Sequence, residues 1–393
     1  MQLLGLYIIE KKRTITKVLE KGWYPFGDYK RPAKGKAVKT RNSTNGEDRS
    51  FASAYAVNIL KEITEYLGGK ELVIPIKNYG NAIVKVENGS LTERFLRKLS
   101  DENQLMDYLC YECKEQLQII KKLKGCSYPD DKIFKRLGVK AYRKYYNGVS
   151  IDHFNEIMYD IFVTKIYDSE DDVFDKASFV RNSGLRVCPY CGKEWIMSTN
   201  RTKRQIDHFL PKRKYPFFAL NYYNLIPACD LCNENPNKGQ KDPLDNNKYG
   251  LIYNPYIFKD TNIRFSFWMD KENLFNDDNF HLLLGFKTCE EQKGYDEFFD
   301  MSDRYEKHHV ETANVVRVFM KRKASSFYQG FNIDDNWLNH MYNDLFAYDA
   351  NNAIPSQQML FRMKNDIFCQ LTGIRKEEEF YTKRMAGRTE TLR

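Results

Sequence analysis

Two pairs of cysteines constrain the fold of this chain more than any other feature of its sequence. Cys188 and Cys191 form the first Cys-x-x-Cys pair, and Cys229 and Cys232 form the second. Two intervening residues let both thiolates of a pair face one ion across a tight turn, and two such turns complete a tetrahedral site of four sulfurs. Because thiolates favour Zn²⁺ or an iron-sulfur cluster, the spacing predicts a metal site, and we expect zinc. The alternative is four unrelated buried cysteines.

The predicted zinc is structural rather than catalytic, since a site of four cysteines leaves no coordination position open. Its binding supplies folding free energy, about 10 kcal/mol in isolated zinc-dependent modules. Gly192 directly follows the first pair and eases the tight backbone of that turn. Thirty-seven residues separate the two pairs, more than in a simple zinc ribbon. We therefore expect a functional segment between them.

Composition indicates a folded chain that works in a reducing compartment. The chain has 393 residues, of which 42% are hydrophobic and 15% aromatic, enough for several cores. It has nine cysteines, an odd number, and its N-terminus resembles a strand rather than a signal peptide, so we expect a cytoplasmic protein. No apolar run approaches about 20 residues, so no membrane contact is expected. The net charge of +9 permits a polyanionic partner.

The pattern along the chain predicts an α+β, mainly helical, multidomain protein. The domains expected are an N-terminal α+β region over 1–90, a helical region over 91–180, the zinc-stapled segment over 181–245, and a C-terminal strand-then-helical region over 246–393. In more detail, we expect a helix over 51–67, strands at 72–76, 82–86 and within 258–286, and mostly helix from 91 to 183 with breaks near Gly125, Pro129 and Gly148. Further helices are expected near 301–327, 334–345 and 358–371, and then a charged tail that frays from Arg375.

Between the cysteine pairs lies Asp207-His208, which suits phosphodiester hydrolysis. Such a reaction needs a base near neutral pH, which an imidazole supplies, and a cation at the phosphate, which a carboxylate can hold. The amide oxygen of Asn233 could share that cation, and its neighbour Cys232 would fix its position. Basic residues flank the dipeptide and suit phosphate contacts, although an ordinary basic surface loop is the alternative: Arg201, Lys203, Arg204, Lys212, Arg213 and Lys214.

These residues together resemble the HNH endonuclease motif, also called the ββα-metal or His-Me finger, over roughly residues 185–245. The resemblance implies a central ββα-metal module in which His208 is the general base and Asp207 and Asn233 ligate a divalent cation such as Mg²⁺. It implies that Asn224 braces the loop that carries the base, and that Lys238 is the basic residue of the following helix. Water activated by His208 would then attack phosphorus, leaving 5′-phosphate and 3′-hydroxyl ends.

The chain is also similar to bacterial HNH proteins that partner an ATPase in anti-phage systems of the Septu type. The segments that carry this similarity are 206–212, 215–224, the helical stretch with Tyr305 and His308, and 363–367. The similarity implies a DNA target and an ATPase partner. It does not extend to the first 180 or so residues.

One internal repeat limits how much the Asp-His dipeptide means alone. Ile151-Asp152-His153-Phe154 repeats the string at 206–209, but it lies in a helical pattern without paired cysteines. We therefore expect His153 to be structural. Two other functions remain open: the same site acting on RNA, or a zinc-stapled adaptor that binds nucleic acid or protein without catalysis.

Overall fold

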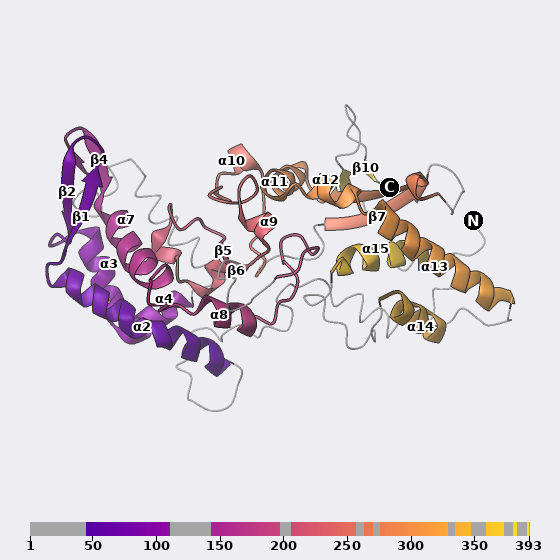
Figure 1. Ribbon diagram of the computed structural model, residues 1–393, viewed down its shortest axis with the longest axis horizontal. Helices are drawn as coiled ribbons and strands as arrows, with labels where there is room; N and C mark the ends of the chain where they lie inside the picture. The colour runs from indigo at the N-terminus through magenta and orange to yellow at the C-terminus, as the bar shows by residue number, and fades with distance from the viewer. Residues whose placement is uncertain are drawn as a thin grey trace. The chain divides into compact units, whose positions relative to one another are not determined.

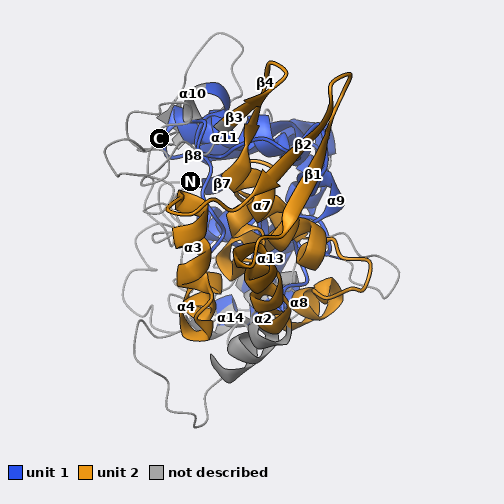
Figure 2. Cartoon of the chain, turned by 90° about the vertical axis from the view of Figure 1, so that its left-hand side faces the viewer, with its two compact units in different colours: residues 1–28, 183–197, 227–393 blue, residues 29–182, 198–226 orange. Residues whose placement is uncertain are grey.

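A computed structural model describes residues 45–110, 143–196, 206–256, 263–269, 276–328, 335–346, 359–372, 380–382 and 391–392. The contacts divide the chain into two compact units, and the described part of unit 1 lies within 183–197 and 227–393. Unit 2 takes the described residues of 29–182 and 198–226 (Figure 2). Unit 2 therefore contains a segment that lies between the two cysteine pairs of unit 1. The four consecutive domains expected from the sequence stay a prediction.

Unit 2 is built on helix α2 (Asn45–Leu67), which packs on α3 (Leu91–Leu99), α4 (Glu102–Leu109) and the π-helix η1 (Tyr159–Tyr167). Its buried residues recur at helical spacing, as Tyr55, Ile59 and Ile63. The helix ends at Gly68-Gly69, as expected, and Gly69 has a φ of 103°. The other helices of the unit are α3 (Leu91–Leu99), α4 (Glu102–Leu109), α7 (His153–Met158), the π-helix η1 (Tyr159–Tyr167) and α8 (Lys176–Asn182).

Two hairpins complete the first part of unit 2. Strands β1 (Glu71–Ile76) and β2 (Gly80–Lys85) pair antiparallel, which confirms the two strands expected there. Strands β3 (Arg143–Tyr146) and β4 (Val149–Asp152) form a second hairpin, so the expected helix is wrong over these residues. Its turn explains the difference. Asn147 and Gly148 have φ angles of 48° and 83°, the geometry that favours Asn-Gly between paired strands.

The segment with the Asp-His dipeptide forms a small sheet. Strand β5 (Ile206–His208) pairs with β6 (Leu225–Pro227), and the connection contains the 3-10 turns η2 (Pro216–Phe218) and η3 (Tyr222–Asn224). Helix α9 (Asp230–Asn233) follows β6 directly and belongs to unit 1. Strand, strand and helix thus follow one another along the chain, and the ββα-metal fold stays a prediction.

Unit 1 has a four-stranded sheet in the order β10-β9-β8-β7. Helix α15 (Phe361–Thr372) packs against strand β7 (Ile263–Met269), as Figure 1 shows, and helix α13 (His309–Tyr328) packs against strand β8 (Phe280–Phe286). Arg362 and Asp366 form a buried ion pair on α15, and Asp366 accepts a hydrogen bond from the backbone N–H of Phe265 at 3.0 Å. The elements are α10 (Asn246–Tyr249), β7 (Ile263–Met269), η5 (Asp277–Asn279), β8 (Phe280–Phe286), α11 (Cys289–Phe299), α12 (Met301–Glu306), α13 (His309–Tyr328), α14 (Asp335–Phe346), α15 (Phe361–Thr372), β9 (Phe380–Thr382) and β10 (Thr391–Leu392).

These elements confirm an α+β chain of helices and small sheets. The strands within 258–286 and the three C-terminal helical regions lie where the sequence places them. The frayed tail is wrong for 380–382 and 391–392, since β9 pairs with both β8 and β10. The expected N-terminal strand lies outside the described residues. In the part of the chain that the structure describes, every helix is too short or too polar to cross a membrane.

Candidate functional site

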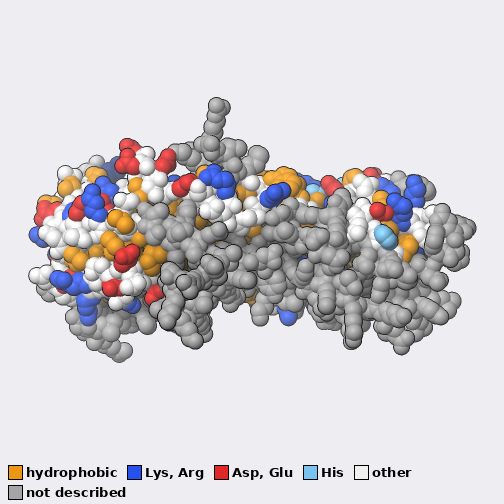
Figure 3. Space-filling model, turned by 90° about the horizontal axis from the view of Figure 1, so that it is seen from below, with side chains coloured by type: hydrophobic (Ala, Val, Ile, Leu, Met, Phe, Trp, Pro, Cys, Tyr) orange, Lys and Arg blue, Asp and Glu red, His pale blue; other side chains and the backbone are white. Residues whose placement is uncertain are grey.

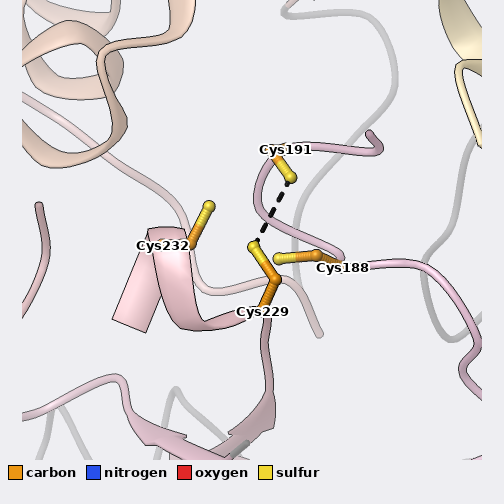
Figure 4. A group of neighbouring side chains, drawn as sticks. All are labelled: Cys188, Cys191, Cys229 and Cys232. Atoms are coloured by element: carbon orange, nitrogen blue, oxygen red, sulfur yellow. Dashed lines mark hydrogen bonds between the residues drawn. The ribbon is translucent and has the colours of Figure 1, made fainter. Parts of the chain in front are cut away.

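The four cysteines of the two pairs lie together in unit 1, as predicted. All four are buried, and their sulfur atoms lie within 4.8 Å of one another. Figure 4 shows the sulfurs converging from the 188–192 turn and from the start of α9, with Cys191 and Cys229 Sγ atoms 3.9 Å apart. A tetrahedral zinc with Zn–S bonds of about 2.3 Å holds its sulfurs about 3.8 Å apart. The cluster can therefore hold a zinc ion after only a small contraction.

Local backbone geometry brings the sulfurs together. In the first turn, Gly192 has a φ of 61°, and its N–H donates to the carbonyl of Cys188 at 2.7 Å. The glycine predicted to ease this turn therefore occupies the left-handed region. In the second turn, Cys229 is the N-cap of α9, and the N–H of Cys232 donates to the carbonyl of Cys229 at 3.1 Å.

Burial and mutual hydrogen bonding set the protonation of the thiols. Burial raises the pKa of Cys188 and Cys232. Burial acts in the same direction on Cys191, but hydrogen bonds from the other three thiols and the nearby charge of Arg304 lower the pKa of Cys191 below its usual value. A metal binds the thiolate rather than the thiol, so metal binding would release protons from the cluster.

Helix α12 supports this cluster through two adjacent residues. Arg304 Nη1 donates to the sulfur of Cys232 at 3.3 Å, and the hydroxyl of Tyr305 donates to the carbonyl of Cys191. Burial lowers the pKa of Arg304, but the charges of Cys232 and Cys191 outweigh it, so the pKa is raised. A zinc ion with four thiolates carries a net charge of about −2, so a guanidinium beside it is stabilising. Sequence inspection did not single out Arg304.

His208 ends strand β5 in unit 2 and is buried. Its Nε2 lies 3.0 Å from the carbonyl oxygen of Ala219. Because a carbonyl only accepts, this contact assigns the ring proton to Nε2 and the lone pair to Nδ1. The ring of Tyr167 meets the imidazole edge to face at 4.5 Å between centroids. Burial, and then the charges of Asp168 and Asp207, raise the pKa of Tyr167.

Asn224 is fully buried and ties together both ends of the loop that follows the base. Its Oδ1 accepts a hydrogen bond from the N–H of Leu210 at 2.7 Å. Its Nδ2 donates to the carbonyl of Leu210 at 3.1 Å and to that of Phe218 at 3.0 Å. Phe218 immediately precedes Ala219, whose carbonyl holds His208. These contacts fit the bracing role that the motif implies for Asn224.

The repeated Asp-His string has different surroundings. Asp152 is the N-cap of α7 and accepts from the N–H of Asn155 at 3.1 Å. His153 is buried, and its Nε2 lies 3.1 Å from the hydroxyl of Tyr146, whose ring stacks on the imidazole. These are the contacts of a structural histidine, as expected.

Asp207 is buried in unit 2, whereas the motif residues Asn233 and Lys238 lie in unit 1. Asn233 is the last residue of α9, and its N–H donates to the carbonyl of Cys229 at 3.0 Å. Lys238 is fully buried, and its N–H donates to the carbonyl of Cys232 at 3.2 Å. Cation ligation by Asp207 together with Asn233 stays a prediction, and so does contact of Lys238 with a substrate.

Three of the six flanking basic residues are described, and each lies over an aromatic ring. Lys212 lies 4.7 Å from the ring centroid of Tyr167. The corresponding distances are 5.1 Å from Arg213 to Tyr159 and 5.7 Å from Lys214 to Tyr215. Arg201, Lys203 and Arg204 lie outside the described residues. Substrate contact by all six stays a prediction.

Comparison with known proteins finds two short similarities. The chain is 41% identical over 73 residues to "Protein ea31" of Escherichia phage lambda, which covers 19% of this chain and 22% of that protein. It is 36% identical over 70 residues to "Septu protein PtuB" of Bacillus thuringiensis, which covers 18% of this chain and 24% of that protein. The chain thus spans less than a quarter of the length of either relative. No family model matches the chain, and no solved structure matches it.

Proposed function

We propose that this chain is a metal-dependent HNH endonuclease that hydrolyses phosphodiester bonds in DNA. The observation that carries the proposal is the fixed orientation of His208 at the end of β5. The carbonyl of Ala219 lies 3.0 Å from Nε2 and fixes the orientation of the ring. A neutral imidazole can take a proton from water as a general base. Asn224 fixes the loop that supplies this carbonyl, so the imidazole is oriented before substrate binds.

In the proposed site, Asp207 and Asn233 hold a divalent cation, with Mg²⁺ as the expected ion. A carboxylate and an amide oxygen are ligands that hard cations prefer. When bound, the cation supplies positive charge against the charge that develops on the phosphate and the leaving 3′ oxygen. Asn233 is one residue after Cys232, so the zinc cluster and Arg304 would hold the backbone that carries it.

We further propose that the chain acts in anti-phage defence together with an ATPase partner. The similarity to "Septu protein PtuB" supports this role. Because a phage protein shares a segment of similar length, phage infection is the appropriate test. Cells that carry the chain together with an ATPase partner should survive infection, and the His208→Ala variant should abolish that protection.

The activity itself is tested by nicking of supercoiled plasmid with added Mg²⁺, with a structured RNA in a parallel reaction. The purified chain, or the chain with a co-purified ATPase, should nick DNA, and His208→Ala should lower the rate by at least about 100-fold, the usual contribution of a general base. His153→Ala is the matched control, since it changes the same string elsewhere in unit 2 and should leave nicking unchanged. Cleavage of RNA alone would refute the DNA assignment, and undiminished nicking by His208→Ala would refute the mechanism.

A further inference from the structure

The ring of Tyr167 connects His208 with two ammonium groups. Tyr167 is the last residue of η1. Its ring meets the imidazole of His208 edge to face, and the two ring centroids lie 4.5 Å apart. Lys176 Nζ lies 4.3 Å from the centre of the same ring, and Lys212 Nζ lies 4.7 Å from it. A tyrosine ring attracts cations to its face, so it holds both ammonium groups near the base. Lys176 comes from α8 and had no role in the motif.

A single carboxylate serves both lysines. Asp168 lies 2.6 Å from Lys212 Nζ and 3.3 Å from Lys176 Nζ. Burial raises the pKa of Asp168, but the charges of Lys212 and Lys176 outweigh it and hold that pKa below its usual value. Burial lowers the pKa of Lys176, although Asp168 acts against this effect. Lys176 and Lys212 thus share Asp168, and the charge of Asp172 also acts on Lys176.

This lysine pair, Lys176 and Lys212, is accessible to a ligand. Each of the two side chains keeps 23% of its surface exposed. Elsewhere, the described surface on the face that Figure 3 shows has basic and acidic side chains interspersed rather than separated. The lysine pair places two ammonium groups on the ring that contacts His208. Lysine ammonium groups bind phosphate as mobile point charges.

We propose that the lysine pair binds a backbone phosphate of the nucleic acid beside the bond that the water activated by His208 hydrolyses, and that Asp168 competes with this phosphate. Asp168 holds the ammonium groups in place while the site is empty. A phosphate then replaces its oxygen atoms as their partner, because the lysine stems can turn a short distance without moving the backbone. This inference rests on the proposed function for the identity of the polymer.

The competition predicts opposite effects for substitutions within one cluster. Binding is measured by fluorescence anisotropy of a short labelled DNA duplex, in a His208→Ala background without added divalent cation, between about 50 and 200 mM KCl. The double variant Lys176→Gln/Lys212→Gln should lower the slope of log affinity against log salt by about 0.9, which is about a 3.5-fold change over this range, and each single variant should lower the slope by about half as much. Asp168→Asn should tighten binding several-fold, because it removes the competing carboxylate.

Two controls separate binding from folding. Lys165→Gln removes an exposed lysine of the same π-helix and should not change the slope. Lys176→Arg keeps the charge and should restore the slope, and far-UV circular dichroism verifies that each variant is folded. Slopes for Lys176→Gln and Lys212→Gln that equal the slope of Lys165→Gln would overturn the proposal, as would weaker binding by a folded Asp168→Asn variant.

The outcome is independent of cleavage. If the chain does not nick DNA but its variants show these slopes, the phosphate site is supported and the proposed nuclease activity is refuted. A chain that nicks DNA with unchanged slopes keeps the nuclease and refutes the phosphate site.

Discussion

Replacement of Asn224 by alanine should destabilise unit 2 by about 3 kcal/mol, since it removes three buried hydrogen bonds that contribute about 1 kcal/mol each. The substitution leaves the N–H of Leu210 and the carbonyls of Leu210 and Phe218 in a buried site without their hydrogen bonds to Asn224. Because the side chain of Asn224 is fully buried, water does not replace these contacts without a rearrangement of the loop. The free energy of unfolding is measured by urea titration followed by far-UV circular dichroism.

Asn221 provides a matched control three residues earlier. It is also fully buried, donates to the carbonyl of Tyr108 at 2.8 Å and accepts from the N–H of Tyr223 at 3.1 Å. Asn221→Ala should therefore cost at least about 2 kcal/mol. Only Asn224→Ala should also lower the rate of plasmid nicking at a temperature where both variants are folded, because only Asn224 ties the backbone beside Ala219.

Two outcomes would refute this reasoning. A loss of stability below about 1 kcal/mol for Asn224→Ala would mean that the loop does not depend on its three hydrogen bonds. An equal fall in nicking for both variants would mean that Asn224 acts through general stability rather than through the orientation of His208.

Further substitutions test the zinc cluster and the structural histidine. Cys229→Ser should lose the zinc found in the unchanged chain by elemental analysis, and full retention of zinc would contradict the four-sulfur site. Arg304→Gln should release zinc to a chromogenic chelator faster than Lys193→Gln, because only Arg304 contacts a ligand sulfur; equal rates would contradict this role. Burial, and then the charge of Lys144, lower the pKa of His153 in the folded chain. The contribution of neutral His153 to the free energy of unfolding is therefore complete above its unfolded pKa of about 6.5, and it is lost as the pH falls towards the folded pKa. His153→Gln should flatten that part of the urea stability profile against pH, and an unchanged profile would show that His153 does not titrate there.

Local patterns in the sequence predicted what local interactions decide. The helix over 51–67, the pair of strands after it and the convergence of four sulfurs all follow from spacing and turn residues. The β3–β4 hairpin was missed because its Asn147-Gly148 turn lies next to residues with helical periodicity. The turn outweighs that periodicity.

Contacts between distant segments were not predictable from spacing. Arg304 lies 72 residues beyond Cys232, and only packing of α12 brings it to the sulfur. Lys176 and Tyr167 precede His208 by many residues, and no periodicity relates them to it. A basic residue is common on any surface, so the sequence alone gave no reason to choose Lys176 over Lys165.

The segment between the cysteine pairs belongs to unit 2, and this has a consequence for how the chain folds. A metal held by both pairs would close a loop of 37 intervening residues in the denatured ensemble. In the chain-entropy treatment of a cross-link, a loop of that length restricts the unfolded chain by about 4 kcal/mol. Zinc bound by both pairs would thus restrict the segment that contains β5 and β6, although the zinc ligands lie outside these strands. During synthesis, the four-sulfur site can bind zinc only after Cys232 has left the ribosome. Zinc starvation should therefore delay formation of the strand that ends in His208.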